Sequence, residues 1–140
     1  MTNPTRSPLC VDVLRDDNLL PAGTVLRLDG TTDMIDVDRP DLFSLWLEEN
    51  PYHATAVWLP GPRGAYVLRW GGAQIIPGIT PEMHSLSGLA ASIYALAMPE
   101  HAERRKQRGS GFNGPQMWRV SNGASLADIA AAHDRNYLPR

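Results

Sequence analysis

Two stretches of alternating hydrophobic residues around an Asp-Gly pair constrain the fold of this chain more than any other feature. Residues 24–28 alternate before Asp29-Gly30, and residues 33–37 alternate after it. Alternation with period two is typical of a strand that buries one face. Asp-Gly favours a tight turn because both residues tolerate positive φ. The pattern predicts an antiparallel hairpin with one buried face and one acidic, hydrated face.

A second hairpin is predicted between residues 55–59 and 65–70, which a loop rich in proline and glycine separates. In the later strand, Tyr66, Leu68 and Trp70 share one face. Shorter strands are expected at 11–13, 73–76 and 117–120. Together these segments predict a mixed, mostly antiparallel sheet built from about residues 9–76 plus a strand near 116–120.

Three helices are expected to pack against this sheet. An Asp cap and an early proline predict a helix near 40–49. Thr80-Pro81-Glu82 has the same capping pattern and predicts a long helix at about 81–98. Ser125 caps a third helix near 125–134.

The long helix is expected to be the most buried of the three. Its large hydrophobic residues recur at helical spacing, at Leu86, Leu89, Ile93 and Leu96. Pro99 ends the helix, and a polar segment follows as far as Arg108. The elements together predict an α+β fold in which the long helix packs across the sheet.

Length and composition predict one domain that needs no covalent or metal support. We expect residues 1–8 to form a flexible tail and residues 9–140 a single α+β domain, with a Gly-rich loop at 109–115. Cys10 is the only cysteine, which excludes an intramolecular disulfide. No signal peptide or membrane-spanning run is evident, so we expect a soluble cytoplasmic protein without membrane contact.

Charge is unevenly distributed along the chain. Residues 1–50 carry ten acidic and four basic side chains, and residues 51–140 carry five acidic and nine basic ones. This asymmetry is compatible with head-to-tail association or a charged partner, and equally with two hydrated surfaces. Arginine outnumbers lysine twelve to one. That ratio indicates a GC-rich genome, with a phage or other mobile element as one possible source.

A basic run followed by glycines and aromatic residues is the most suggestive candidate binding segment. Basic side chains neutralise phosphates, and aromatic rings stack on bases. A hydrated helix end, or a protein or other anionic partner, explains the same residues. The candidate binding residues are Arg104, Arg105, Lys106, Arg108, Phe112, Asn113, Trp118 and Arg119.

No motif for catalysis, metal binding or a cofactor is found, and none of these is expected. The histidines lack the spacing that places two ligands on one helix face. The acidic residues near 29–41 lack the glycine and terminal glutamate of a calcium loop. A site assembled from distant segments would combine His53, the acidic hairpin and Arg69, which suggests a small hydrolase-like enzyme.

The C-terminal segment resembles the start of two known modules. Residues 118–130 are similar to the opening of a LysM repeat, a family that binds N-acetylglucosamine polymers. Residues 125–133 are similar to the first helix of a helix-turn-helix domain. Only ten residues follow Ala130, too few to complete either module. We therefore expect neither family unless the natural protein continues beyond Arg140.

Three functional hypotheses follow. The leading one is a non-catalytic binding or accessory protein that engages another macromolecule and self-associates. Four tryptophans, at 46, 58, 70 and 118, motivate it because aromatic residues anchor interfaces. The alternatives are the hydrolase-like enzyme and a nucleic-acid-associated factor that uses residues 104–119.

Overall fold

A five-stranded antiparallel sheet with the strand order β4-β3-β2-β1-β5 forms the centre of the molecule. The computed structural model describes residues 9–29, 40–71, 83–108 and 112–134. Every strand pairing within these residues is antiparallel, and the predicted α+β class is confirmed. The strands are β1 (Val25–Leu28), β2 (Thr55–Trp58), β3 (Leu68–Trp70), β4 (Met83–His84) and β5 (Trp118–Arg119).

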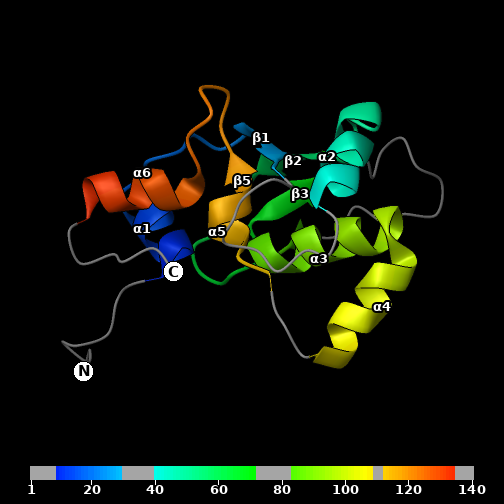
Figure 1. The fold of residues 1–140 in the computed structure, drawn as a ribbon. Helices are drawn as coiled ribbons and strands as arrows, with labels where there is room; N and C mark the ends of the chain where they lie inside the picture. The colour runs from blue at the N-terminus through cyan, green and yellow to red at the C-terminus, as the bar shows by residue number, and fades with distance from the viewer. Residues whose placement is uncertain (1–8, 30–39, 72–82, 109–111, 135–140) are drawn as a thin grey trace.

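The helices in the described residues surround this sheet. Figure 1 shows α1 beside α6 at one end of the molecule, and α2 and α4 at the other. Between them α3 runs along the sheet and contacts β3. The helices are α1 (Cys10–Asp16), α2 (Pro40–Glu49), α3 (Leu86–Ala97), α4 (Pro99–Arg108), α5 (Gly114–Met117) and α6 (Leu126–His133).

One face of the sheet is packed because hydrophobic residues alternate along each strand. Leu26 lies opposite Ala56, and Trp58 lies opposite Leu68. All four side chains are fully buried, whereas Val25 on the other face of β1 is exposed. The alternation therefore orients every central strand toward one hydrophobic core.

The second predicted hairpin is confirmed as the β2–β3 pair, with one difference. Trp70 is buried and lies opposite Ala56, as the alternation requires. Tyr66, which was expected on the same face as Leu68 and Trp70, is 71% exposed. The ladder begins only at Leu68, so Tyr66 lies in the preceding loop.

The helix predicted near 40–49 is confirmed as α2. Phe43 and Leu47 are one turn apart and both are buried. The ring of Phe43 meets the ring of Tyr94 edge to face, with centroids 5.0 Å apart. This aromatic contact joins α2 to α3.

The strand predicted at 11–13 is wrong, because these residues belong to α1. Cys10, Val13 and Leu14 are buried, which is the spacing of a helix rather than of a strand. The helix packs against α6. Tertiary packing therefore outweighs the preference of the two valines for extended structure.

The long helix predicted at about 81–98 begins later than expected. Ser85 is the N-cap of α3, and its Oγ accepts a hydrogen bond from the backbone N–H of Gly88 at 3.0 Å. Met83 and His84 form β4 instead, at the edge of the sheet beside β3. The chain thus contains two candidate caps, and strand pairing selects the second.

The polar segment that follows α3 is a helix in its own right. Pro99 is the first residue of α4, where its missing N–H costs nothing. At the C-terminal end, the helix predicted near 125–134 is confirmed as α6. Ser125 and Asp128 form a reciprocal capping box at its start.

Several predictions lie outside the described residues. These are the tail at 1–8, residues 33–37, the strand at 73–76 and the first part of the Gly-rich loop, at 109–111. The hairpin predicted between 24–28 and 33–37 is wrong, because β1 pairs with β2 on one side and its residues next to the turn, Arg27 and Leu28, pair with β5 on the other. The end of the predicted loop is also wrong, because Gly114 and Pro115 begin α5. The strand predicted near 116–120 is confirmed over the two residues of β5.

Residues 114–118 lie directly on the first turn of α3, and this seat fixes the position of β5. The backbone N–H of Gly114 donates to Ser87 Oγ at 3.0 Å. The indole N–H of Trp118 donates to the Leu86 carbonyl at 2.9 Å. Trp118 also pairs with Leu28 of β1. One short segment therefore joins α3 to the sheet.

Gly114→Ala should destabilise the protein by about 1–3 kcal/mol, the usual cost of overpacking a core. An added Cβ would lie 2.5 Å from the Leu86 carbonyl carbon and 2.5 Å from the Ser87 nitrogen. Gly61→Ala is the matched control, because its Cβ would meet nothing closer than the Arg63 oxygen at 3.8 Å. Urea unfolding followed by tryptophan fluorescence measures both variants. Equal urea midpoints for the two variants would contradict this close contact between Gly114 and α3.

Candidate functional site

The structure describes five of the eight predicted binding residues, and it places them in different surroundings. Arg104 is exposed on α4. The structure does not describe the side chains of Arg105, Lys106 and Arg108. The ring of Phe112 is half-buried, with its centroid 5.4 Å from that of Tyr94. Asn113 caps α5 by accepting from the backbone N–H of Gln116 at 3.4 Å.

Trp118 and Arg119, the last two predicted binding residues, have structural partners. Trp118 is fully buried, so its ring offers no face to a nucleic-acid base in this arrangement. Arg119 Nε lies 2.8 Å from a carboxylate oxygen of Asp29, and its guanidinium also donates to the Gly123 carbonyl at 2.8 Å. Nucleic-acid binding by residues 104–119 stays a prediction, and it depends on the basic residues of α4.

The tryptophans give little support to an aromatic interface. Trp58 and Trp118 are fully buried, and Trp70 is buried as well. Trp46 is only partly buried, and its ring meets the ring of His53 at a centroid distance of 5.3 Å. Most of the tryptophan surface is therefore used inside the core.

The described groups of the proposed hydrolase-like site lie on different elements, and some have other partners. The His53 ring lies near Trp70, at a centroid distance of 6.3 Å. Arg69 leaves β3 on the opposite face from Trp70, because neighbouring side chains alternate. Asp29 pairs with Arg119, and Asp41 is exposed on α2. Within the described ranges, no three His, Cys, Asp or Glu side chains are grouped to hold a metal ion.

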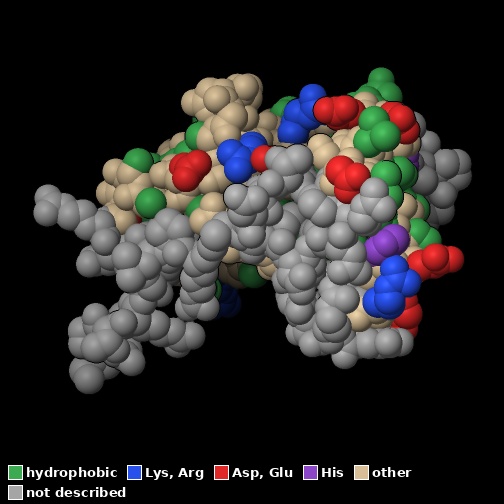
Figure 2. Space-filling view, viewed as in Figure 1, with side chains coloured by type: hydrophobic (Ala, Val, Ile, Leu, Met, Phe, Trp, Pro, Cys, Tyr) green, Lys and Arg blue, Asp and Glu red, His purple; other side chains and the backbone are tan. Residues whose placement is uncertain are grey.

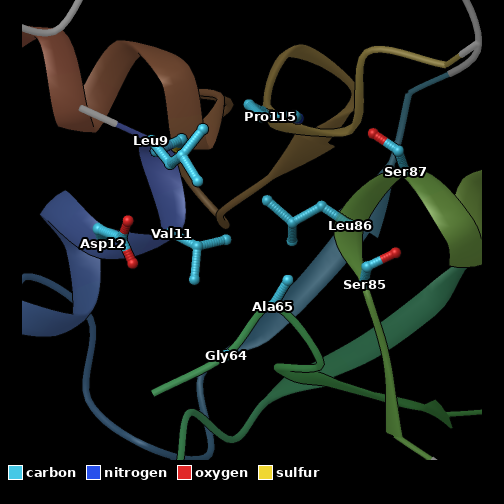
Figure 3. A pocket seen from close by; sticks show the side chains of 10 residues that line it. Leu9, Val11, Asp12, Gly64, Ala65, Ser85, Leu86, Ser87 and Pro115 are labelled. Carbon is cyan, nitrogen blue, oxygen red and sulfur yellow. The ribbon is translucent and has the colours of Figure 1, made fainter. Parts of the chain in front are cut away.

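An apolar pocket lies between α1 and the start of α3. It has a volume of about 350 Å³. Figure 3 shows Leu9 and Val11 on the α1 side and Leu86 facing them from α3. The residues that line it are Leu9, Cys10, Val11, Asp12, Gly64, Ala65, Ser85, Leu86, Ser87 and Pro115.

Serines at the start of α3 supply the polar part of the wall. Ser85 Oγ accepts from the N–H of Gly88 at 3.0 Å, and Ser87 Oγ accepts from the N–H of Gly114 at 3.0 Å. A hydroxyl that accepts still carries its own proton, which it can donate. Both hydroxyl oxygens are thus engaged by backbone N–H groups, and the surface that the pocket offers is mainly hydrocarbon.

A charged pair fixes the opposite wall. Arg15 donates to a carboxylate oxygen of Asp12 at 2.6 Å and to the Gly64 carbonyl at 2.6 Å. The guanidinium thus ties α1 to the loop that carries Ala65. Since the Asp12 carboxylate already faces a cation, the pair holds the wall in place rather than presenting an unpaired charge.

Sequence reasoning did not identify this pocket. Its lining comes from residues 9–12, 64–65, 85–87 and Pro115, which no local pattern connects. Residues 11–13 were expected in a strand, and residues 85–87 in the interior of a helix. Ser85 could have indicated the start of α3, because serine is a favoured N-cap residue and a periodic apolar run follows it.

No protein-family model, curated protein or solved structure matches this chain. The functional argument therefore rests on the residues themselves. Among the described residues, no helix has the length and apolar character that a membrane span requires.

Trp118→Phe should lower the free energy of unfolding by about 1–3 kcal/mol, because the Leu86 carbonyl loses its indole donor and the core loses volume. Tyr52→Phe removes a polar group from an exposed ring and should stay within about 0.5 kcal/mol. Chemical denaturation gives both values. A Trp118→Phe protein as stable as wild type would show that the indole is not a structural group.

Proposed function

We propose that this protein is a non-catalytic binding or accessory protein of the cytoplasm that engages another macromolecule. The apolar pocket between α1 and α3 is the observation that carries the proposal. Its size lies at the lower end of the range of ligand pockets, and it suits one or two apolar side chains of a partner.

The rim of the pocket supports a macromolecular partner. Leu9 lines the pocket and is 61% exposed, although apolar surface in water costs roughly 25 cal/mol per Å². Ala65, on the other side, is also exposed. A partner that covers this rim together with the pocket would remove both from water. Interfaces gain most of their affinity from a few residues that fill well-packed, desolvated pockets near the centre.

The chemistry of the lining favours binding over catalysis. A nucleophilic serine or cysteine needs a base within hydrogen-bond reach. The lining contains no histidine or lysine among the described residues, and its carboxylate, Asp12, is held by Arg15. The hydroxyl oxygens of Ser85 and Ser87 accept from backbone N–H groups. These groups support the architecture of the pocket.

Ala65→Trp should block the pocket and lower partner binding at least about tenfold, which corresponds to about 1.4 kcal/mol of binding free energy. Ala22→Trp is the matched control, since Ala22 is exposed in a loop and does not line the pocket. Partners are captured from the native host with the tagged full-length chain and quantified by mass spectrometry. The proposal predicts a partner that Ala65→Trp loses and Ala22→Trp retains.

Equal recovery with the two tryptophan variants would contradict a role for the pocket. A chain that captures no partner in its own host would contradict the binding function as a whole.

A further inference from the structure

The face of the sheet that points away from the core carries three arginines. Arg27 of β1 lies directly opposite Arg119 of β5, and Arg69 of β3 lies opposite Val57 of β2. Val57 in turn lies opposite Val25, which is two residues from Arg27 on the same strand. Directly opposite residues and residues two apart share one face of a sheet. We call Val25, Arg27, Val57, Arg69 and Arg119 the arginine face.

This face is open to solvent at β1, where Arg27 and Val25 are exposed. The helix α3 packs on the other face, because it contacts β3 and its Leu86 carbonyl accepts from the buried Trp118 indole. Figure 2 shows Lys or Arg side chains along the upper side of the molecule, above β5 and β1 of Figure 1, with acidic side chains farther along at α2.

The placement of the arginines is electrostatically unfavourable for the folded chain by itself. Like charges directly opposite each other on neighbouring strands repel. Asp29 neutralises Arg119 at 2.8 Å, but among the described residues no carboxylate pairs with Arg27 or Arg69. Arg69 is half-buried, and its Nε is shielded from water without an acceptor in the described part of the chain. A partly desolvated guanidinium of this kind favours the approach of an anion.

Aliphatic side chains lie between the arginines, and they favour a protein as the source of this anion. Val25 is 54% exposed, and Val57 beside it is half-buried. Sheets that bind single-stranded nucleic acids stack the bases on aromatic rings. The tryptophans of β2, β3 and β5 are instead buried on the core face. The described strands therefore offer charge and hydrocarbon on the arginine face, but no ring.

The spacing of Arg27 and Arg69 defines the partner more closely. The two residues lie two strands apart and two positions apart along the strands. With about 4.8 Å between strands and about 3.3 Å per residue, their Cα atoms are about 12 Å apart. In an extended peptide, side chains four residues apart share a face and are separated by about 13 Å. The residue midway between them points to the same face.

We infer that the arginine face binds an extended acidic segment of a partner protein. Carboxylates four residues apart pair with Arg27 and Arg69, and an aliphatic residue midway between them packs against Val57. The planar guanidinium can bind a carboxylate through two parallel hydrogen bonds. Arginine is also among the residues that contribute most to interface affinity. Such charge pairing fixes the register of the bound segment.

This inference rests on the proposed binding function, because it names the chemistry of a macromolecular partner. None of the residues of the arginine face lines the pocket. The arginine face and the pocket can therefore fail separately.

Displayed libraries of short peptides provide the probe. In one library every peptide has two glutamates four residues apart, with Val, Ile or Leu midway between them and uncharged residues elsewhere. In the second library glutamine replaces both glutamates. Each library is selected on the full-length chain, and the affinity of enriched peptides is measured by fluorescence anisotropy. We expect enrichment from the glutamate library alone.

Arg27→Glu should weaken binding of an enriched peptide at least about tenfold, because it reverses the charge that faces one carboxylate. The same variant should gain affinity for that peptide when lysines replace its glutamates. Arg63→Glu is the matched control, since Arg63 is an exposed arginine in the loop between β2 and β3, and it should leave the affinity unchanged. Circular dichroism confirms that both variants fold.

A glutamate library without enriched peptides would overturn the inference, as would enriched peptides that bind Arg27→Glu as tightly as wild type or that lose equal affinity with Arg63→Glu. A labelled oligothymidylate that binds when the peptides do not would assign the face to a nucleic acid and would overturn it too.

The pocket variants separate this inference from the proposed function. If the peptides respond as expected while Ala65→Trp and Ala22→Trp recover host partners equally, the pocket fails and the arginine face stands. If the pocket variants differ while the glutamate library gives no binder, the binding function stands and only the arginine face fails.

Discussion

The seat of residues 114–118 on the first turn of α3 is the contact on which the rest of the structure depends. Gly114 approaches the backbone of Leu86 and Ser87 so closely that no side chain fits. The buried Trp118 indole then bonds to the Leu86 carbonyl. These contacts place β5 beside β1. The chain leaves β5 toward α6, which packs on α1. A single close approach thus joins the N-terminal helix, the sheet and the C-terminal helix.

The same contact shapes the pocket that we propose as a binding site. Leu86, Ser87 and Pro115 line the pocket. They also lie at the contact between residues 114–118 and the first turn of α3. On the other side, Arg15 bonds Asp12 and the Gly64 carbonyl and so fixes the facing wall. The walls of the pocket are therefore held by the same hydrogen bonds that support the core. Preformed walls lower the ordering cost that a partner must overcome on binding.

Local signals were sufficient where local chemistry determines the structure. The Asp and Pro pattern before α2 and the Ser125 cap of α6 both predicted the correct helices, because capping depends on neighbouring residues. Residues 11–13 were misread because three residues do not distinguish a strand from a helix. The start of α3 was misplaced because β4 pairing overrides the earlier cap. Trp118 was taken for a binding residue, since its partner Leu86 lies 32 residues away and no local pattern indicates such a contact.

Hydrogen exchange of the Trp118 indole N–H, followed by NMR on the wild-type chain, tests the seat most directly. If the indole is bonded to Leu86 in the core, its proton should exchange only through global unfolding, with an exchange free energy equal to that of denaturation. The partly buried Trp46 indole provides an internal comparison. Exchange of the Trp118 proton at the rate of an unprotected indole would contradict the seat and, with it, the pocket that the seat forms.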